Sequence, residues 1–173
     1  MKLGIDIGRV LITPESSDRK SDTSFIGGSL DDALRTPPYE GMFENVPRLV
    51  EFFKGNVWLV SKARQRMQEK TRLWLLHHHF YEKTGISPNN LRFCIERHQK
   101  ADHCIQLGIT HFIDDRLDVL GYLRQCVRHR YLFGPQRPGT SVPSGVTHVI
   151  GWEATVRVMM GNQDCDSQQR SQG

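Results

Sequence analysis

Four polar signals in this sequence each follow an apolar stretch of the kind that forms a buried strand. The signals, in chain order, are Asp6, Ser61, Lys100 and the pair Asp114-Asp115. Because the carboxyl ends of parallel strands lie at one edge of a sheet, where open α/β sheets bind their ligands, we expect these side chains to share one site. A single Asp after a strand is more often a solvated or capping residue, so the prediction depends on all four signals together.

The chemistry that these residue types support is phosphoryl transfer. Asp6, Asp114 and Asp115 would form a cluster of carboxylates that repel one another unless a cation neutralises them. Oxygen-only ligands favour a hard ion, and magnesium commonly shares carboxylates with a phosphate. Lys100 would place a point charge, and Ser61 a hydroxyl hydrogen bond, on phosphoryl oxygens. Asp6 is also a candidate nucleophile, since a carboxylate can attack phosphorus and form an aspartyl-phosphate.

The elements that must position these residues alternate between strands and helices. Strands are predicted at residues 2–12, with a sharp bend at Gly8, and at 57–60, 91–95, 110–113, 130–133 and 147–150. The main helices are predicted from Asn45 to Gly55 and at 63–83, 101–107, 117–123 and 152–160. This alternation calls for right-handed crossovers and predicts an α/β fold, a Rossmann-like three-layer α/β/α sandwich with a mainly parallel central sheet.

The predicted helix at residues 63–83 carries two further expectations. Leu73, Leu76 and Phe80 recur at steps of three and four, which predicts that they share its buried face. The consecutive histidines 77–79 point to different faces of such a helix, so we interpret them as surface and boundary residues rather than as a shared metal site.

Length and composition favour a single domain. The 173 residues are 38% hydrophobic and 24% charged, which is ordinary for a globular protein. We expect the domain to span residues 1–160, with a surface loop over most of 13–38 and no large cap domain. Residues 161–173 are rich in polar types and are predicted to form a disordered tail. The net charge of +4 indicates tolerance for anionic partners and gives only weak support to nucleic acid.

Several features predict a cytoplasmic protein that does not contact a membrane. The first strand begins at residue 2, which leaves no room for a targeting peptide. No apolar run approaches the roughly 20 residues that span a bilayer. The four cysteines have neither CxxC nor zinc-site spacing, so they are interpreted as reduced thiols.

The order Asp6-x-Gly8, Ser61, Lys100 and Phe112-Ile113-Asp114-Asp115 resembles the haloacid dehalogenase (HAD) superfamily over about residues 1–135. The resemblance implies a Mg²⁺-dependent phosphatase that works through an aspartyl-phosphate. Carried over, Asp6 would be the nucleophile, Ser61 the phosphate-binding hydroxyl and Lys100 the charge-stabilising lysine. The metal ligands would be Asp6, the main-chain carbonyl of Gly8, Asp114 and Asp115. Arg9 and Lys62 are further candidates for substrate binding, although a solvated helix start is the simpler interpretation of Lys62.

Gly8 departs from the family pattern, because most phosphatases of this family have a second Asp there that protonates the leaving group. Such an acid is generally worth about 10²- to 10⁴-fold in rate, and good leaving groups need it least. The short intervals between motifs resemble capless members of the family, which act on macromolecules or have their site closed by a partner subunit. The phosphorylated substrate is therefore left open between a small molecule and a macromolecular end, and the oligomeric state is left open too.

Other interpretations of the same residues were weighed. A phosphoreceiver domain has its acidic pair first in the chain, whereas here the pair follows Ser61 and Lys100. No cysteine is followed by Arg at the sixth position, and no P-loop, GxGxxG or HExxH motif occurs. The alternative that stays open is a catalytically weak HAD-like module that binds a phosphate or a partner. Gly8 favours this alternative, and the five intact polar residues oppose it.

Overall fold

The computed structural model describes residues 1–13 and 28–170, with side chains described as far as Gly161. Its centre is an open sheet of six parallel strands in the order β3-β2-β1-β4-β5-β6. The strands are β1 (Leu3–Ile5), β2 (Val57–Lys62), β3 (Leu91–Cys94), β4 (His111–Asp114), β5 (His129–Phe133) and β6 (Val146–Val149). The predicted α/β class and parallel sheet are confirmed.

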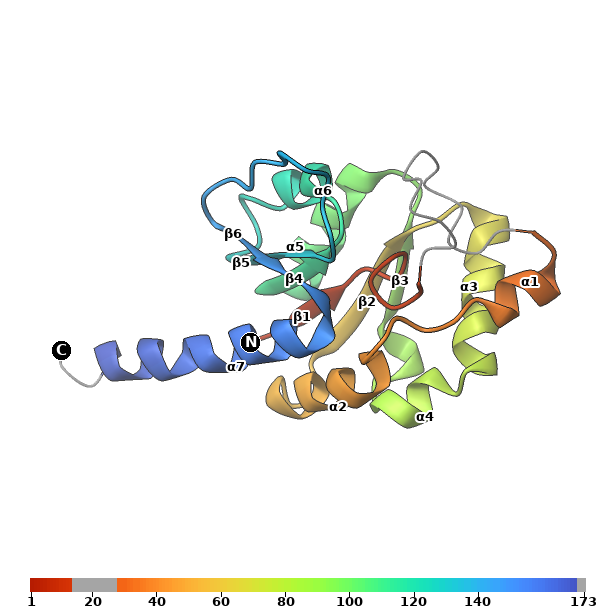
Figure 1. Ribbon diagram of the computed structural model, residues 1–173, viewed down its shortest axis with the longest axis horizontal. Helices are drawn as coiled ribbons and strands as arrows, with labels where there is room; N and C mark the ends of the chain where they lie inside the picture. Colours follow the sequence, from red (N-terminus) through yellow and green to blue (C-terminus); the bar gives the residue numbers. More distant parts are fainter. Residues whose placement is uncertain (14–27, 171–173) are drawn as a thin grey trace.

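Helices cover both faces of this sheet and make the protein a Rossmann-like three-layer sandwich (Figure 1). The α-helices of the described residues are α1 (Leu30–Arg35), α2 (Met42–Phe52), α3 (Gln65–His77), α4 (Phe80–Thr84), α5 (Lys100–Leu107), α6 (Leu117–Tyr122) and α7 (Gly151–Arg170). Two short 3₁₀ helices, η2 (Pro88–Asn90) and η3 (Arg97–Gln99), flank β3. Helices α5 and α6 pack on one face, whereas α1 to α4 and α7 pack on the other.

Alternating side chains along the strands divide the core between the two faces. Leu3 and Ile5 of β1 pack with α2, α3 and α7, while Gly4 between them faces the opposite layer. A Cβ atom built on Gly4 would lie 2.4 Å from Cδ2 of Phe112, which belongs to that second layer. Gly4 is therefore required by the close approach of the Phe112 ring rather than by a turn.

The connectivity places one crevice at the centre of the sheet. From β1 the chain moves outward through β2 to β3, and it then crosses to β4 on the other side of β1. Ligands of open α/β sheets bind outside the carboxyl ends of the strands at this kind of reversal. Asp6, directly after β1, and Asp114, at the end of β4, lie at this point.

The first predicted strand is wrong beyond Ile5. The chain turns after Asp6, and the amides of Leu11 and Ile12 both donate to the carbonyl of Ile7, at 2.9 and 3.2 Å. Val10, Leu11 and Ile12 are fully buried in this turn, and of these three Ile12 alone pairs with other backbone, through isolated bridges to Gly8 and Pro38. The left-handed backbone of the bend lies at Arg9, with φ of 59°, and not at Gly8.

Two of the predicted helices also differ from the structure. Helix α2 begins at Met42, because Gly41 adopts the left-handed conformation before it. Asn45 is not its cap but lies inside it, with Nδ2 donating to the carbonyl of Gly41 at 2.8 Å. Helix α7 continues to Arg170 instead of ending at Met160, and its last turns extend beyond the sheet (Figure 1). Residues 171–173 of the predicted tail and 14–27 of the predicted loop lie outside the described residues.

The single helix predicted at residues 63–83 is wrong in length, and of the three residues predicted to be buried only Phe80 is buried. It divides into α3 and α4 at His79, which has a left-handed backbone with φ of 53°. Leu73 and Leu76 are exposed, at 43% and 61%, because Trp74 is buried in their place and donates its Nε1 hydrogen to the carbonyl of Thr36 at 2.7 Å. That hydrogen bond ties the buried face of α3 to the segment after α1.

At the opposite end of the sheet, the buried imidazole of His111 stacks on the half-buried imidazole of His129. His111 lies against His129, with ring centroids 4.3 Å apart, and meets Phe53 edge to face at 5.0 Å. Burial, followed by the charges of His129, the amino terminus and Arg128, lowers the pKa of His111 to about 4.

None of the described helices is both long and apolar enough to cross a bilayer.

Stability should therefore fall in mild acid because of His111. The unfolded chain binds the His111 proton near pH 6.5 and the folded chain only near pH 4, so the free energy of unfolding decreases as pH falls through this window. His111→Gln should make this pH dependence shallower in urea titrations between pH 7 and 4. The exposed His77→Gln serves as the control, and equal slopes for His111→Gln and wild type would contradict the assignment.

Candidate active site

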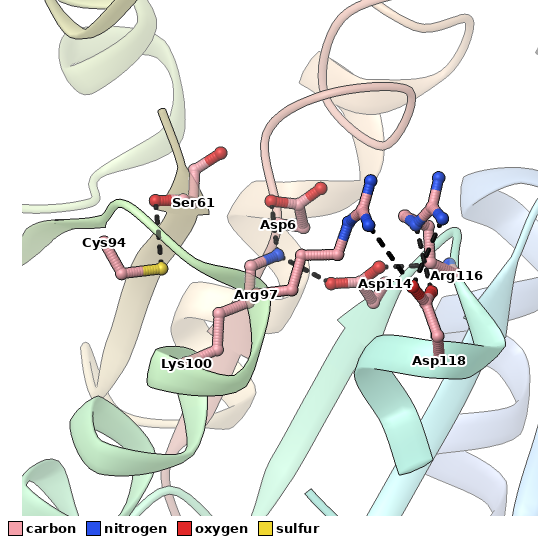
Figure 2. Close-up of polar contacts among 8 residues, drawn as sticks. All are labelled: Asp6, Ser61, Cys94, Arg97, Lys100, Asp114, Arg116 and Asp118. Atoms are coloured by element: carbon pink, nitrogen blue, oxygen red, sulfur yellow. Dashed lines mark hydrogen bonds and ion pairs between the residues drawn. The ribbon is translucent and has the colours of Figure 1, made fainter. Parts of the chain in front are cut away.

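The side chain of Lys100 is the centre of the site. It is buried, with 2% of its surface exposed, and its Nζ donates to Asp6 Oδ1 at 2.8 Å and to Asp114 Oδ2 at 2.7 Å. Figure 2 shows the ammonium group between the two carboxylates, below the loop that follows β1. Complete burial opposes the charged form, but Asp114 and Asp6 outweigh it and hold the pKa of Lys100 above its ordinary value.

Local structure explains why Lys100 points to this place. The side chain of Gln99 accepts from the amides of Ile95 and Glu96, at 3.1 and 2.8 Å, and so closes the turn η3 directly after β3. Helix α5 then begins at Lys100, which turns its first residue toward the carboxyl ends of β1 and β4. The hydrogen bonds of the Gln99 side chain thus help to direct Lys100 toward Asp6 and Asp114, which are 94 and 14 residues away in the sequence.

Three carboxylates meet at this point, as the sequence predicts. Oxygen atoms of Asp6, Asp114 and Asp115 lie within 4.8 Å of one another. Burial, together with repulsion from Asp6 and Asp115, raises the pKa of Asp114 to about 8, although Lys100 acts in the opposite direction. Burial and the charge of Asp6 likewise raise the pKa of Asp115 to about 6. One lysine does not neutralise three carboxylates, so the cluster has room for a further cation.

The donor set fits a hard divalent ion. All of its ligand atoms are oxygens, and Gly8, whose carbonyl is the predicted fourth ligand, lines the same cleft. Two ligands at about 2.1 Å from one Mg²⁺ are at most about 4.2 Å apart, so the carboxylates would draw together only slightly. Asp6 and Asp115 line the cleft, whereas Asp114 is fully buried beneath them and also accepts from the Arg116 amide at 3.0 Å.

The cleft above the carboxylates brings the remaining predicted residues together. Arg9, Ser61 and Lys62 all line it, beside Asp6 and Lys100. Ser61 lies on β2 and is 3% exposed, and its carbonyl accepts a weak hydrogen bond from Cys94 Sγ at 3.8 Å (Figure 2). No hydrogen bond joins its hydroxyl to another described residue, which leaves the hydroxyl available to a ligand. The proximity of the predicted residues is therefore established, and their roles remain predictions.

Arg9 holds an unusual backbone at the edge of this cleft. A left-handed conformation costs a residue other than glycine about 1–2 kcal/mol, so it persists only where the surroundings enforce it. Here the Nε1 hydrogen of the buried Trp152 donates to the carbonyl of Val10 at 3.0 Å, and the amide of Tyr39 donates to the carbonyl of Leu11 at 2.8 Å. These bonds fix the turn and hold the Arg9 side chain on the cleft.

Two cleft residues, Arg97 and Arg116, were not predicted from the sequence. Asp118 holds both, with its carboxylate 3.6 Å from Arg97 Nη1 and 3.0 Å from Arg116 Nε (Figure 2). Asp118 is therefore a partner of these guanidinium groups and lies outside the carboxylate cluster. The available signals were weak: Arg116 follows the acidic pair directly, and Arg97 precedes Lys100 by one helical turn.

A scan against models of known protein families finds no match for this chain, and a search of curated proteins finds none either. The chemistry of the site must therefore be inferred from its own geometry and charges.

Replacing Lys100 by an uncharged residue should leave two buried carboxylates without their cationic partner. Removing one partner of a buried ion pair typically costs about 3–5 kcal/mol, and we expect a loss of this size for Lys100→Met in urea titrations at pH 7. The loss should grow from pH 6 to pH 9, because Lys100 lowers the pKa of Asp114, which is about 8 in the wild type, and only above that pH is the carboxylate charged and without its partner.

A second substitution serves as the internal control. Adding Asp114→Asn to Lys100→Met removes one of the two carboxylates that lack a cationic partner, and it should restore part of the lost stability. If Lys100→Met alone costs less than about 1 kcal/mol, the pair is not desolvated as the structure indicates.

Proposed function

We propose that this protein is a Mg²⁺-dependent phosphohydrolase that forms an aspartyl-phosphate on Asp6, similar to the HAD superfamily. The observation that carries the proposal is the pairing of Asp6 with buried Lys100 at 2.8 Å, inside a carboxylate cluster that opens onto a cationic cleft. A nucleophilic carboxylate, an oxygen-only cation site and phosphate-binding groups are the parts that this reaction needs.

Each residue has a definite task in this proposal. Lys100 holds Oδ1 of Asp6, and no hydrogen bond from a described residue reaches Oδ2, which is the oxygen proposed to attack phosphorus. The Ser61 hydroxyl and the Lys100 ammonium bind the phosphoryl oxygens, while the cations of Arg9 and Lys62 bind the rest of the substrate at the outer wall of the cleft. Asp6, Asp114, Asp115 and the Gly8 carbonyl would hold a Mg²⁺ ion. When bound, this ion would stabilise the negative charge on the phosphoryl oxygens.

The alternative function is a module that binds a phosphate or a partner without turnover. Gly8 favours it, because this position has no side chain that could protonate a leaving group. The preserved cluster around Lys100 opposes it, because buried like charges are costly to keep without a task for them. A phosphatase assay separates the two functions.

The buried thiols agree with a cytoplasmic location, which is part of the proposal. Burial raises the pKa of Cys94 to about 11 and that of Cys104 to about 12, so both stay protonated at neutral pH. Such thiols behave as packing residues rather than as reactive groups or disulfide partners.

Asp6→Asn should abolish phosphate release from 4-nitrophenyl phosphate in the presence of Mg²⁺. The amide keeps the shape of the side chain but is a poor nucleophile, so we expect kcat to fall at least about 10³-fold. The exposed Asp102→Asn on α5 has the same chemical change outside the cleft and should retain activity. Equal turnover by Asp6→Asn and wild type would remove Asp6 from the mechanism, and inactivity of wild type would favour the binding module.

Gly8→Asp should supply the missing acid. Its kcat/KM for an alkyl phosphate should rise by about 10²-fold, because an alkoxide must be protonated as it leaves, whereas 4-nitrophenolate leaves unaided. Gly8 does not have the left-handed backbone found at Arg9, so a side chain there meets no penalty of that kind. Gly8→Asn has the same size and no acidic proton, and should leave the ratio of the two substrates as it is in wild type. An equal gain on both substrates would contradict the assignment.

A further inference from the structure

The cleft has more positive charge than a phosphomonoester requires. Its outer wall carries four cations, namely Arg9, Lys62, Arg97 and Arg116. The three carboxylates beneath are balanced by Lys100 and a divalent ion. Even when Asp118 is counted against the outer cations, the described residues leave a surplus of one positive charge over a phosphoryl dianion. A substrate that fits this wall would bring a second anionic group.

Two of these cations lack a hydrogen-bonded or ion-paired partner among the described residues, although the charge of Arg9 acts to lower the pKa of Asp115. No hydrogen bond or ion pair joins the Arg9 guanidinium or the Lys62 ammonium to another described residue, whereas Arg97 and Arg116 both contact Asp118. Arg9 is moreover held on the cleft by a backbone conformation that arginine rarely adopts. These two side chains are therefore positioned for a ligand.

The described wall of the cleft also lacks a group that could protonate a leaving group. Its only carboxylates are Asp6, the proposed nucleophile, and Asp115, a proposed metal ligand. Its arginines keep their protons, because a guanidinium is not deprotonated in proteins, and the Lys100 ammonium is held in its charged form by Asp114 and Asp6. The remaining described basic donor is Lys62, and an alkylammonium is a weak acid near neutral pH. Among the described residues, this wall is therefore best suited to a leaving group that departs as a stable anion.

Both observations describe the same kind of substrate. We propose that the site acts on phosphoanhydrides and removes the terminal phosphate of a pyrophosphate linkage, an inference that rests on the proposed phosphohydrolase function. The leaving group of an anhydride is itself a phosphate, which is a stable anion without a proton donor. It also supplies the second anionic group, which Arg9 and Lys62 bind at the cleft wall.

The Asp6 carboxylate forms a bond to the terminal phosphorus, the bond from that phosphorus to the bridging oxygen breaks, and the electron pair stays on the departing phosphate. Water then attacks the phosphorus of the aspartyl-phosphate, which restores the Asp6 carboxylate. One hydrogen of that water remains on the released orthophosphate, and the other goes to solvent or to the departed phosphate, which is basic enough to accept it.

Four substrates separate the effect of charge from that of the leaving group. Propyl phosphate has neither feature, propane-1,3-diyl bisphosphate has the second anion only, 4-nitrophenyl phosphate has the good leaving group only, and inorganic pyrophosphate has both. We expect pyrophosphate to have the highest kcat/KM of the four, at least about 10²-fold above propyl phosphate. If either intermediate substrate equals or exceeds pyrophosphate, the inference is overturned.

Arg9→Gln and Lys62→Gln test the proposed contacts. Each removes a charged hydrogen bond to the leaving phosphate, so kcat/KM for pyrophosphate should fall about 10- to 100-fold, and more than the value for 4-nitrophenyl phosphate. Arg157→Gln on α7 removes one exposed charge far from the cleft and should change neither value. Equal losses on both substrates in Arg9→Gln and Lys62→Gln would overturn the assignment of these residues.

Binding gives a readout that is independent of turnover. In calorimetry at a fixed concentration of free Mg²⁺, methylenebisphosphonate should bind wild type about tenfold tighter than methylphosphonate does, and Arg9→Gln should remove most of this difference. Release of phosphate from 4-nitrophenyl phosphate that depends on Asp6, without preference for pyrophosphate, would overturn this inference and leave the proposed function standing. No Asp6-dependent release from any of the four substrates would overturn both.

Discussion

The burial of one ammonium group between two carboxylates is the constraint on which the rest of the site depends. Lys100 joins the start of α5 to the ends of β1 and β4, and its two contacts at 2.8 and 2.7 Å span 94 and 14 residues of sequence. Replacing a buried ion pair by apolar residues is often neutral or stabilising, so stability alone does not explain why this one is kept. Asp115, a third carboxylate beside this ion pair, adds electrostatic repulsion that lowers the stability of the fold. The arrangement is understandable as a site prepared for a cation and an anionic ligand.

The sheet topology makes this convergence possible, and distant hydrogen bonds hold it in place. The crossover from β3 to β4 brings Asp114 next to Asp6 at the reversal of strand order. The turn after β1 is then fixed from outside the site, because Trp152 of α7 donates to the carbonyl of Val10. The last helix of the chain thereby helps to position Arg9 beside the first strand. Such support from a separate layer is what allows a strained residue to persist at a binding edge.

The sequence predicts that the polar residues at the ends of apolar stretches share one site. The alternation of strands and helices implies a parallel sheet, and the carboxyl ends of parallel strands lie at one edge of it. Asp6, Ser61, Lys100 and Asp114 were found in this way. Features decided by tertiary contacts could not be found: the buried face of α3 depends on the hydrogen bond of Trp74 to Thr36, and Leu73 and Leu76 alone indicate the wrong face. Arg97 forms an ion pair with Asp118 at the cleft, a tertiary contact that the sequence does not indicate, and a left-handed conformation at Arg9 is not what its residue type favours.

The depth of each charge in the cleft suggests a division of labour. Asp114 and Lys100 are almost without exposed surface, so they act in a region of low dielectric where charges interact strongly. They can orient Asp6 and stabilise the charge that develops on the transferred group, but they do not reach solvent to select what is attached to it. Arg9 and Lys62 are only partly buried and line the open wall, where under the proposed function they would contact the leaving group. Under the proposed function, changes at the wall would alter the range of substrates without disturbing the buried ion pair, and the outer cations would be the part of the site that sets specificity.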